Sequence, residues 1–294
     1  MPHRFAFVSL LALLSLGSSI QPALSQALVP HVLQFDNEQL KQTGLALAQE
    51  AAQLAQFQQF EPALSRARLA TQFAPQAYET WAILGVLYSE VEQPGQGVAA
   101  LERARALSPK SASVLFSLGT AYFQQNNYQA AIRVLQEGLA LKPSTPEALF
   151  DLGNAHYKLG QYQDAVAQYS KAVTLDRKFW PAINNIGLIK YEMGDVAAAM
   201  QQWQAAIALD SKAGEPRLAL AVALYAQGRQ AQAVALAEAA LKLDSSYADV
   251  NYLKENLWGA RLVADAQKML ATPRLQATIA QIEAQQPSPA NSSQ

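Results

Sequence analysis

Apolar residues between residues 44 and 247 recur at positions i, i+3, i+4 and i+7, the spacing of one face of an α-helix. Small residues interrupt this pattern at regular places, where two helix backbones can approach each other closely. One column of small residues has a period of 34 and consists of Gly85, Gly119, Gly153 and Gly187. A second column follows it by twelve residues and includes Ala131, Ala165 and Ala199. The chain is therefore predicted to repeat a helical unit of 34 residues.

Each unit is predicted to hold two helices, because turn signals fall at its middle and at its end. Residues 159–161, 193–195 and 227–229 read LGQ, MGD and QGR, and their glycines permit the left-handed conformation that ends a first helix. Prolines close the second helix in the early units. Six units are predicted, at residues 44–77, 78–111, 112–145, 146–179, 180–213 and 214–247.

This pattern resembles the tetratricopeptide repeat (TPR) family. The resemblance rests on residues in three units that match the family's pattern. They are Trp81, Leu84, Gly85, Tyr88, Leu101, Ala104 and Pro109; Leu118, Gly119, Tyr122, Ala131, Gly138 and Pro143; and Leu152, Gly153, Ala165, Tyr169 and Ala172. It implies an all-α fold, a right-handed superhelix of helix–turn–helix units. It also implies a concave face, built mainly from first helices, that binds another protein.

The regions that flank the repeats differ in character. Residues 248–285 keep a helical pattern, broken near Thr272 and Pro273, and are predicted to form C-terminal capping helices. Residues 286–294 (QPSPANSSQ) are predicted to be a disordered tail, and residues 26–43 are predicted to be a linker or a loose helix.

The N-terminus has the features of an export signal. Arg4 precedes an apolar run from Phe5 to Leu16, and small residues follow. The run is shorter than the roughly 20 residues that span a bilayer, which favours a cleaved signal peptide over residues 1–25. An uncleaved N-terminal membrane anchor is the alternative. Either reading places the chain in the periplasm or a thylakoid lumen. In layout and composition the chain resembles exported TPR factors with which cyanobacteria assemble photosynthetic or pigment-synthesis complexes.

Composition and motifs argue against several functions. The formal net charge is −1, so a basic face for nucleic acid is not expected. The chain has no cysteine, and we find no P-loop, GxSxG or HExxH motif. His156 occupies the place of Tyr88 and Tyr122 in earlier units and is interpreted as a packing residue, with Asp151 beside it on the same predicted helix. We expect no enzyme activity, small-molecule substrate, cofactor or metal.

The family resemblance implies that certain positions of the first helix face a partner. The largest of these form an aromatic ladder at 34-residue intervals, Phe123, Tyr157, Tyr191 and Tyr225, which either lines the groove or packs between units. Lys158 stands without the basic cluster of carboxylate-binding TPR domains, so an apolar or aromatic ligand is expected, and asparagines could hold its backbone. The predicted groove residues are Phe116, Thr120, Phe123, Phe150, Asn154, Tyr157, Lys158, Asn184, Leu188, Tyr191 and Tyr225.

The predicted function is therefore a non-enzymatic scaffold that binds a peptide or a partner helix in the groove of units three to six. A self-associating structural protein at a membrane is the alternative.

Overall fold

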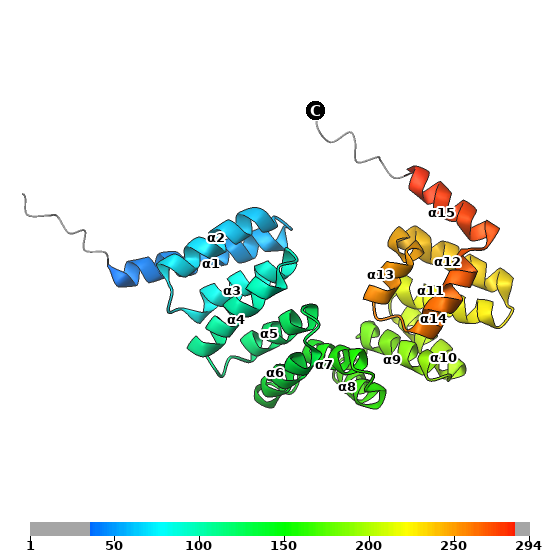
Figure 1. Cartoon of the computed structure of the whole chain (residues 1–294), viewed down its shortest axis with the longest axis horizontal. Coiled ribbons are helices and arrows are strands. Elements are labelled where there is room, and N and C mark those ends of the chain that lie inside the picture. The colour runs from blue at the N-terminus through cyan, green and yellow to red at the C-terminus, as the bar shows by residue number, and fades with distance from the viewer. Residues whose placement is uncertain (1–35, 286–294) are drawn as a thin grey trace, which may run out of the picture. The chain divides into compact units, whose positions relative to one another are not determined.

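The computed structural model describes residues 36–285, which form an α-solenoid without strands (Figure 1). The predicted signal peptide, residues 26–35 and the predicted tail lie outside the described residues. Six helix pairs come first, in the order α1 (Asn37–Gln56), α2 (Phe60–Phe73), α3 (Tyr78–Glu90), α4 (Pro94–Leu107), α5 (Ala112–Gln124), α6 (Tyr128–Leu141), α7 (Pro146–Lys158), α8 (Tyr162–Leu175), α9 (Trp180–Glu192), α10 (Val196–Leu209), α11 (Gly214–Ala226) and α12 (Gln230–Leu243).

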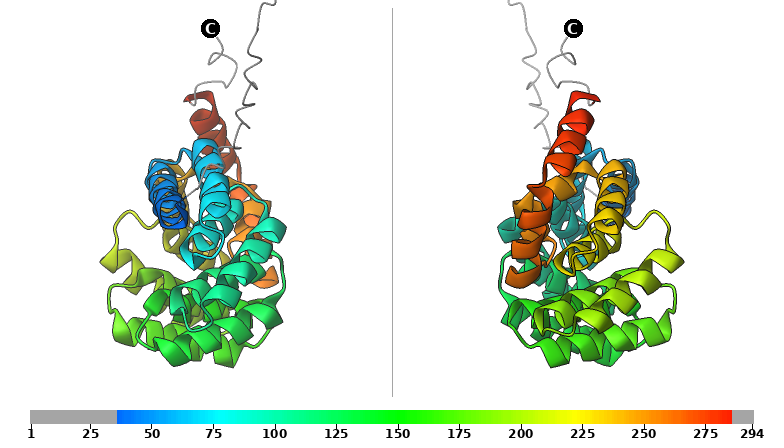
Figure 2. Two further views of the ribbon diagram at one scale, coloured as in Figure 1. Left: turned by 90° about the vertical axis from the view of Figure 1, so that its left-hand side faces the viewer. Right: turned by 90° about the vertical axis from the view of Figure 1, so that its right-hand side faces the viewer.

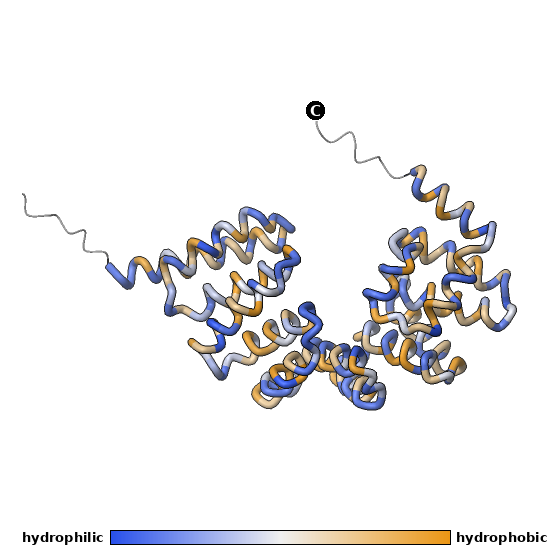
Figure 3. The backbone as a smooth tube through the Cα atoms, viewed as in Figure 1, coloured by the Kyte–Doolittle hydropathy of each residue, from blue (hydrophilic) through white to orange (hydrophobic). Residues whose placement is uncertain are grey.

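Each odd-numbered helix from α1 to α11 packs against the even-numbered helix that follows it, and that helix packs against the first helix of the next pair (Figures 1 and 2). Several first helices also contact one another directly, as in α1 with α3, α3 with α5, and α9 with α11. We call the surface that the first helices form the inner face. The apolar positions shown in orange in Figure 3 alternate with polar ones along every helix, as the sequence pattern predicts.

The columns of small residues mark where the two helices of a pair cross. A Cβ atom added to Gly153 would lie 2.5 Å from Cε1 of Tyr169, and one added to Gly187 would lie 2.5 Å from Nε1 of Trp203. Gly85 and Gly119 have the same relation to leucines sixteen residues later. The glycines therefore make room for a large side chain of the second helix. The alanines of the second column, Ala131, Ala165 and Ala199, are fully buried.

The turn inside each pair uses the left-handed backbone conformation at one position of the repeat. Gly160, Gly194 and Gly228 have φ angles of 72°, 89° and 77° there. The three earlier units adopt the same turn with residues that have side chains, which are Gln58, Glu92 and Asn126 with φ between 57° and 61°. The glycine turns that the sequence predicts thus belong to a column of six equivalent turns.

Four further elements follow the pairs: the 3-10 helix η1 (Ser245–Ala248), α13 (Val250–Glu255), α14 (Ala260–Leu270) and α15 (Pro273–Gln285). α15 begins at the predicted break and packs against α12, whereas α14 packs against α11 and α9. At the other end, α1 begins at Asn37, so part of the predicted linker is regular helix. Over residues 36–285, no helix combines the length and apolarity needed to cross a membrane.

Candidate interaction surface

The aromatic ladder lies on the inner face, one residue near the end of each of α5, α7, α9 and α11. Phe123 and Tyr157 are partly exposed, and each ring also contacts an aromatic ring five residues later, at centroid distances of 5.2 Å to Tyr128 and 5.5 Å to Tyr162. Phe123 and Tyr157 also pack against the core cluster that contains Tyr191 and residues of α14, so the ladder packs between units and is only partly exposed. Tyr191 differs, since it is only 1% exposed.

Two phenylalanines of the predicted groove mainly hold the units together. Phe116 lies against Gly138 in the second helix of its own unit, where a Cβ atom would collide with the ring. Phe150 contacts the rings of Tyr169 and Phe179, at centroid distances of 5.6 Å and 5.5 Å. Both are half-buried, which makes them scaffold residues with an exposed edge rather than free contacts.

Thr120 joins units three and four, because its hydroxyl donates to Oδ2 of Asp151 at 2.9 Å. Burial raises the pKa of the Asp151 carboxyl to about 6, and the hydrogen bond from Thr120 opposes this rise. Glu147, one turn earlier, raises the pKa further. The Thr120 hydroxyl therefore already donates to an internal acceptor, and its place in a groove stays a prediction.

The two asparagines predicted to hold a partner's backbone belong instead to a polar network inside the solenoid. Asn154 Oδ1 accepts from the Tyr169 hydroxyl at 2.7 Å and from Nδ2 of Asn185 at 3.1 Å. Asn184 is fully buried, and its Nδ2 donates to Oδ1 of Asn185 at 3.1 Å. The prediction is corrected for Asn184, because its side chain is fully buried. Asn154 is half-buried, and its Oδ1 already accepts two internal hydrogen bonds.

The inner face of units five and six is covered by α14. This helix buries Leu262, Val263, Ala266, Met269 and Leu270, which recur on one helical face. They join one core cluster with Leu188 and Tyr191 of α9 and with residues of α11. Tyr225 of α11 is partly buried against the same cluster. In unit five, Leu188 and Tyr191 therefore face the chain's own helix rather than an open groove, which corrects their predicted exposure.

Polar contacts fix the direction in which α14 lies. The Glu192 carboxylate accepts from the backbone amides of Arg261 at 3.1 Å and Leu262 at 2.9 Å, so a side chain of α9 caps the N-terminus of α14. The Tyr191 hydroxyl donates to Oδ2 of Asp265 at 2.8 Å. The Arg261 guanidinium lies 5.1 Å from the centroid of the Tyr191 ring. Glu192 and Tyr191 thus recognise a helix by its end and by one acidic side chain.

Lys158 completes the open part of the inner face. Burial lowers the pKa of its amine, and the charge of Glu255 in α13 opposes that change. Burial also raises the pKa of the Tyr157 phenol, helped by the charge of Glu192. The predicted groove residues of α5 and α7 are all half-buried, and we call Phe123, Tyr157 and Lys158, near the ends of these helices, the open surface.

His156 is buried, as its interpretation requires, with Nδ1 at 2.6 Å from Oε1 of Gln161. Its counterparts Tyr88 and Tyr122 likewise bond to side chains, those of Arg68 and Glu102. Among residues 36–285, no three histidine, aspartate or glutamate side chains come together as a metal site would require. The polar residues near the end of α7 thus divide between packing, at His156, and the inner face, at Tyr157 and Lys158.

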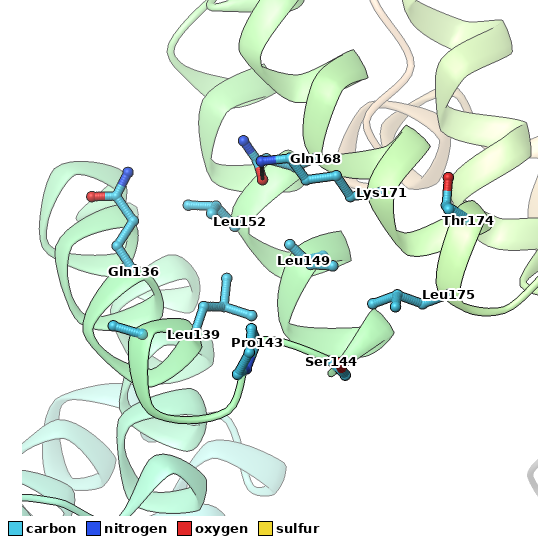
Figure 4. A pocket seen from close by; sticks show the side chains of 11 residues that line it. Gln136, Leu139, Pro143, Ser144, Leu149, Leu152, Gln168, Lys171, Thr174 and Leu175 are labelled. Atoms are coloured by element: carbon cyan, nitrogen blue, oxygen red, sulfur yellow. Dashed lines mark hydrogen bonds between the residues drawn. The ribbon is translucent and has the colours of Figure 1, made fainter.

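A second apolar surface lies between α6 and α8, on the side of the second helices. Its lining combines six apolar residues with polar side chains such as Gln136, Gln168 and Lys171 (Figure 4). Leucines at the last turn of four second helices are 44–47% exposed and continue this surface along the repeats: Leu141, Leu175, Leu209 and Leu243. The repeat pattern contained this column, but periodicity alone does not tell an exposed leucine from a buried one.

Comparison with known proteins agrees with this geometry. A family model described as TPR repeat matches residues 119–160 and 187–228, and one described as tetratricopeptide repeat matches residues 146–179. The chain therefore contains tetratricopeptide repeats. The second match has the bounds expected for unit four. A search of curated proteins finds no match.

Several solved structures share the fold. The crystal structure of MamA is 25% identical, with a TM-score of 0.50 over 55% of this chain and 95% of MamA. PilF of Pseudomonas aeruginosa is 18% identical, with a TM-score of 0.60 over 74% of this chain and 97% of PilF. YrrB, described as a TPR protein with an unusual peptide-binding site, is 20% identical, with a TM-score of 0.51 over 65% of this chain and 95% of YrrB. These likenesses support the TPR solenoid.

Proposed function

We propose that the protein is an interaction scaffold that binds a helix or peptide of another protein on the inner face of units three and four. One observation carries this proposal: the ladder column that stays partly exposed at Phe123 and Tyr157 packs against an amphipathic helix of the same chain at Tyr191. Repeated units present equivalent surfaces, so a partner helix is expected to contact units three and four in the way that α14 contacts units five and six.

The chemistry of the open surface favours an apolar and aromatic contact. Phe123 and Tyr157 supply large, rigid side chains that lose little entropy on binding. Lys158 adds one positive charge beside them, and Glu255 lies close enough to influence it. A partner helix with an apolar stripe and an acidic residue beside it matches this arrangement.

The test uses a photocrosslinking aromatic amino acid in place of Tyr157, produced in the native host. We expect it to capture a defined partner, whereas the same crosslinker in place of Leu141, on the exposed edge of α6, does not. The purified partner should then bind Tyr157→Ala at least about tenfold more weakly than the wild type, and Leu141→Ala unchanged. Equal capture from both sites, or unchanged affinity of a folded Tyr157→Ala variant, contradicts the proposal.

The finer assignment of place and pathway rests on residues 1–25 and on the layout of the chain. We propose export to the periplasm or thylakoid lumen, with assembly of a photosynthetic or pigment-synthesis complex as the role. The basic start and apolar run support export. N-terminal sequencing of the protein from its host measures whether the segment is removed.

A further inference from the structure

The contact between α14 and units five and six differs from the contacts that build the repeats. Second helices pack against the helix just before them in the chain, with small residues at the crossing. α14 instead lies against α9, and its contacts join residues about 70 positions apart in sequence. These contacts combine an apolar stripe with a capped helix end and a tyrosine–aspartate pair. Such a combination is typical of a groove that binds a helix.

The contact between Glu192 and the start of α14 explains why residue 259 is a glycine, whereas its backbone angles do not require one. Its φ and ψ angles of −74° and 169° are ordinary extended values, which any residue adopts. A Cβ atom added there would collide with the Glu192 carboxyl group. The glycine therefore allows Glu192 to reach the amides of Arg261 and Leu262.

The segment before α14 allows this helix to detach from the inner face while the repeats stay folded. Leu257 has a φ of 67°, a left-handed value that costs energy for a residue with a Cβ atom. This conformation closes α13, where the Trp258 amide donates to the Leu253 carbonyl at 3.1 Å, so α14 begins after a completed helix end. Arg261 is exposed and Glu192 only half-buried, so water reaches the end of the helix that would leave first.

We propose that the inner face of units five and six is a second helix-binding site, that α14 occupies it in cis, and that an amphipathic helix of a partner protein binds there in its place. The contacts define this partner's chemistry. It carries a small residue at its start for Glu192, an apolar stripe like that of α14, and an acidic residue at the place of Asp265 for the Tyr191 hydroxyl. This site adjoins the open surface of units three and four, because Phe123 and Tyr157 pack against the cluster that contains α14. The two tests change different residues, so either proposal can fail without the other.

The covalent link gives α14 a high effective concentration, so a partner competes well only when the cis contact is weakened. Gly259→Ala provides such a change in the full chain, because its methyl group displaces the Glu192 carboxylate and leaves all groove residues intact. The probe is a labelled synthetic peptide of residues 256–272, which keeps its own glycine. The matched control peptide carries Leu262→Asp, which places a charge in the apolar stripe.

We expect the probe to bind the Gly259→Ala chain at least tenfold more tightly than the wild type, and the control peptide to bind neither. Hydrogen exchange of the wild type should also show α14 amides exchanging at least tenfold faster than those of α11. Equal binding of the probe to both chains, or binding of the control peptide, would overturn the proposal. Equal protection of α14 and α11 amides in the wild type would also overturn the proposal, because α14 would then open only when the whole scaffold unfolds. This measurement uses the wild type, so it does not depend on whether the Gly259→Ala variant folds.

Discussion

At the scale of single residues, the turn column shows that one backbone conformation is met by different side chains. Gly160 adopts it without strain, whereas Glu92 and Gln58 adopt it with a Cβ atom that approaches the backbone closely. The repeat architecture fixes the turn, and the side chain accommodates it. The first units therefore contain local strain that the later units lack.

This strain predicts that Glu92→Gly stabilises the protein, by about 0.5–1 kcal/mol once the greater freedom of glycine in the unfolded chain is included. The measurement is the free energy of unfolding in urea. The matched control is Gly160→Ala, whose new methyl group would meet no atom within 4 Å but would have a φ of 72°. We expect it to destabilise by about 1 kcal/mol. A loss of stability in Glu92→Gly would show that its side chain makes a contact that outweighs the strain.

Single residues also show where sequence reasoning reaches its limit. Gly153 and Gly187 were identifiable because helix crossings repeat with the period of the chain. Asn154 and Asn184 occupy two positions of the first helix that the family resemblance implies face the groove, yet their hydrogen bonds go to Tyr169 and Asn185. Which polar side chain is buried depends on the neighbouring unit's individual residues, and a repeat pattern does not contain that information.

At the scale of elements, periodicity predicted the six helix pairs but not the place of α14. Its apolar stripe, from Leu262 to Leu270, is readable in the sequence as a helix with one buried face. The surface that this stripe contacts is not readable, because α14 is out of phase with the repeat and contacts α9 as well as α11. Capping helices were predicted over residues 248–285 without a place in the fold, and α14 among them covers the inner face of two units.

Helix crossings yield a prediction at this scale. In Gly187→Ala the new methyl group would lie 2.5 Å from Nε1 and 2.8 Å from Cδ1 of the fully buried Trp203, whose rigid ring has little room to move. We expect a loss of about 1–3 kcal/mol in the free energy of unfolding, the usual range for overpacking. Gly95→Ala is the matched control, since the nearest atom would be 3.7 Å away. It should be neutral or slightly stabilising, because alanine favours helix. Equal effects of the two substitutions would mean that the α9–α10 crossing adjusts freely.

At the scale of the whole molecule, the polar network connects unit four with the C-terminal region. It runs from Asn154 through Asn185 and Asn184 to Glu215 of α11, whose Oε1 accepts from Nε1 of Trp258 at 3.0 Å. Trp258 is buried and directly precedes the start of α14. The docking of the C-terminal helices is therefore linked to a titratable carboxyl group in the core of the solenoid.

This link predicts how stability depends on pH. Burial raises the pKa of Glu215 to about 7 from its ordinary 4.5, and hydrogen bonds from Trp258 and Asn184 only partly offset the rise. Between pH 4.5 and 7 the folded state then holds a proton that the unfolded state has lost, so the free energy of unfolding falls as pH rises through this window and levels off above it. The difference between the two pKa values corresponds to a fall of about 3 kcal/mol. A protonated Glu215 also offers a donor for Oδ1 of Asn184, which has none among residues 36–285.

The substitution that isolates this effect is Glu215→Gln, which keeps an acceptor for Trp258 and cannot titrate. We expect the variant to be more stable than the wild type at pH 8 and close to it at pH 5, as measured by urea unfolding at both values. Asp151, whose pKa is also raised, contributes a slope of the same sign to both proteins, so the difference between them reports Glu215 alone. Asp151→Asn is the matched control and should retain the part of the slope that Glu215 causes. A difference between wild type and Glu215→Gln that does not change with pH would show that Glu215 is ionised throughout, and that the network holds a charge rather than a proton.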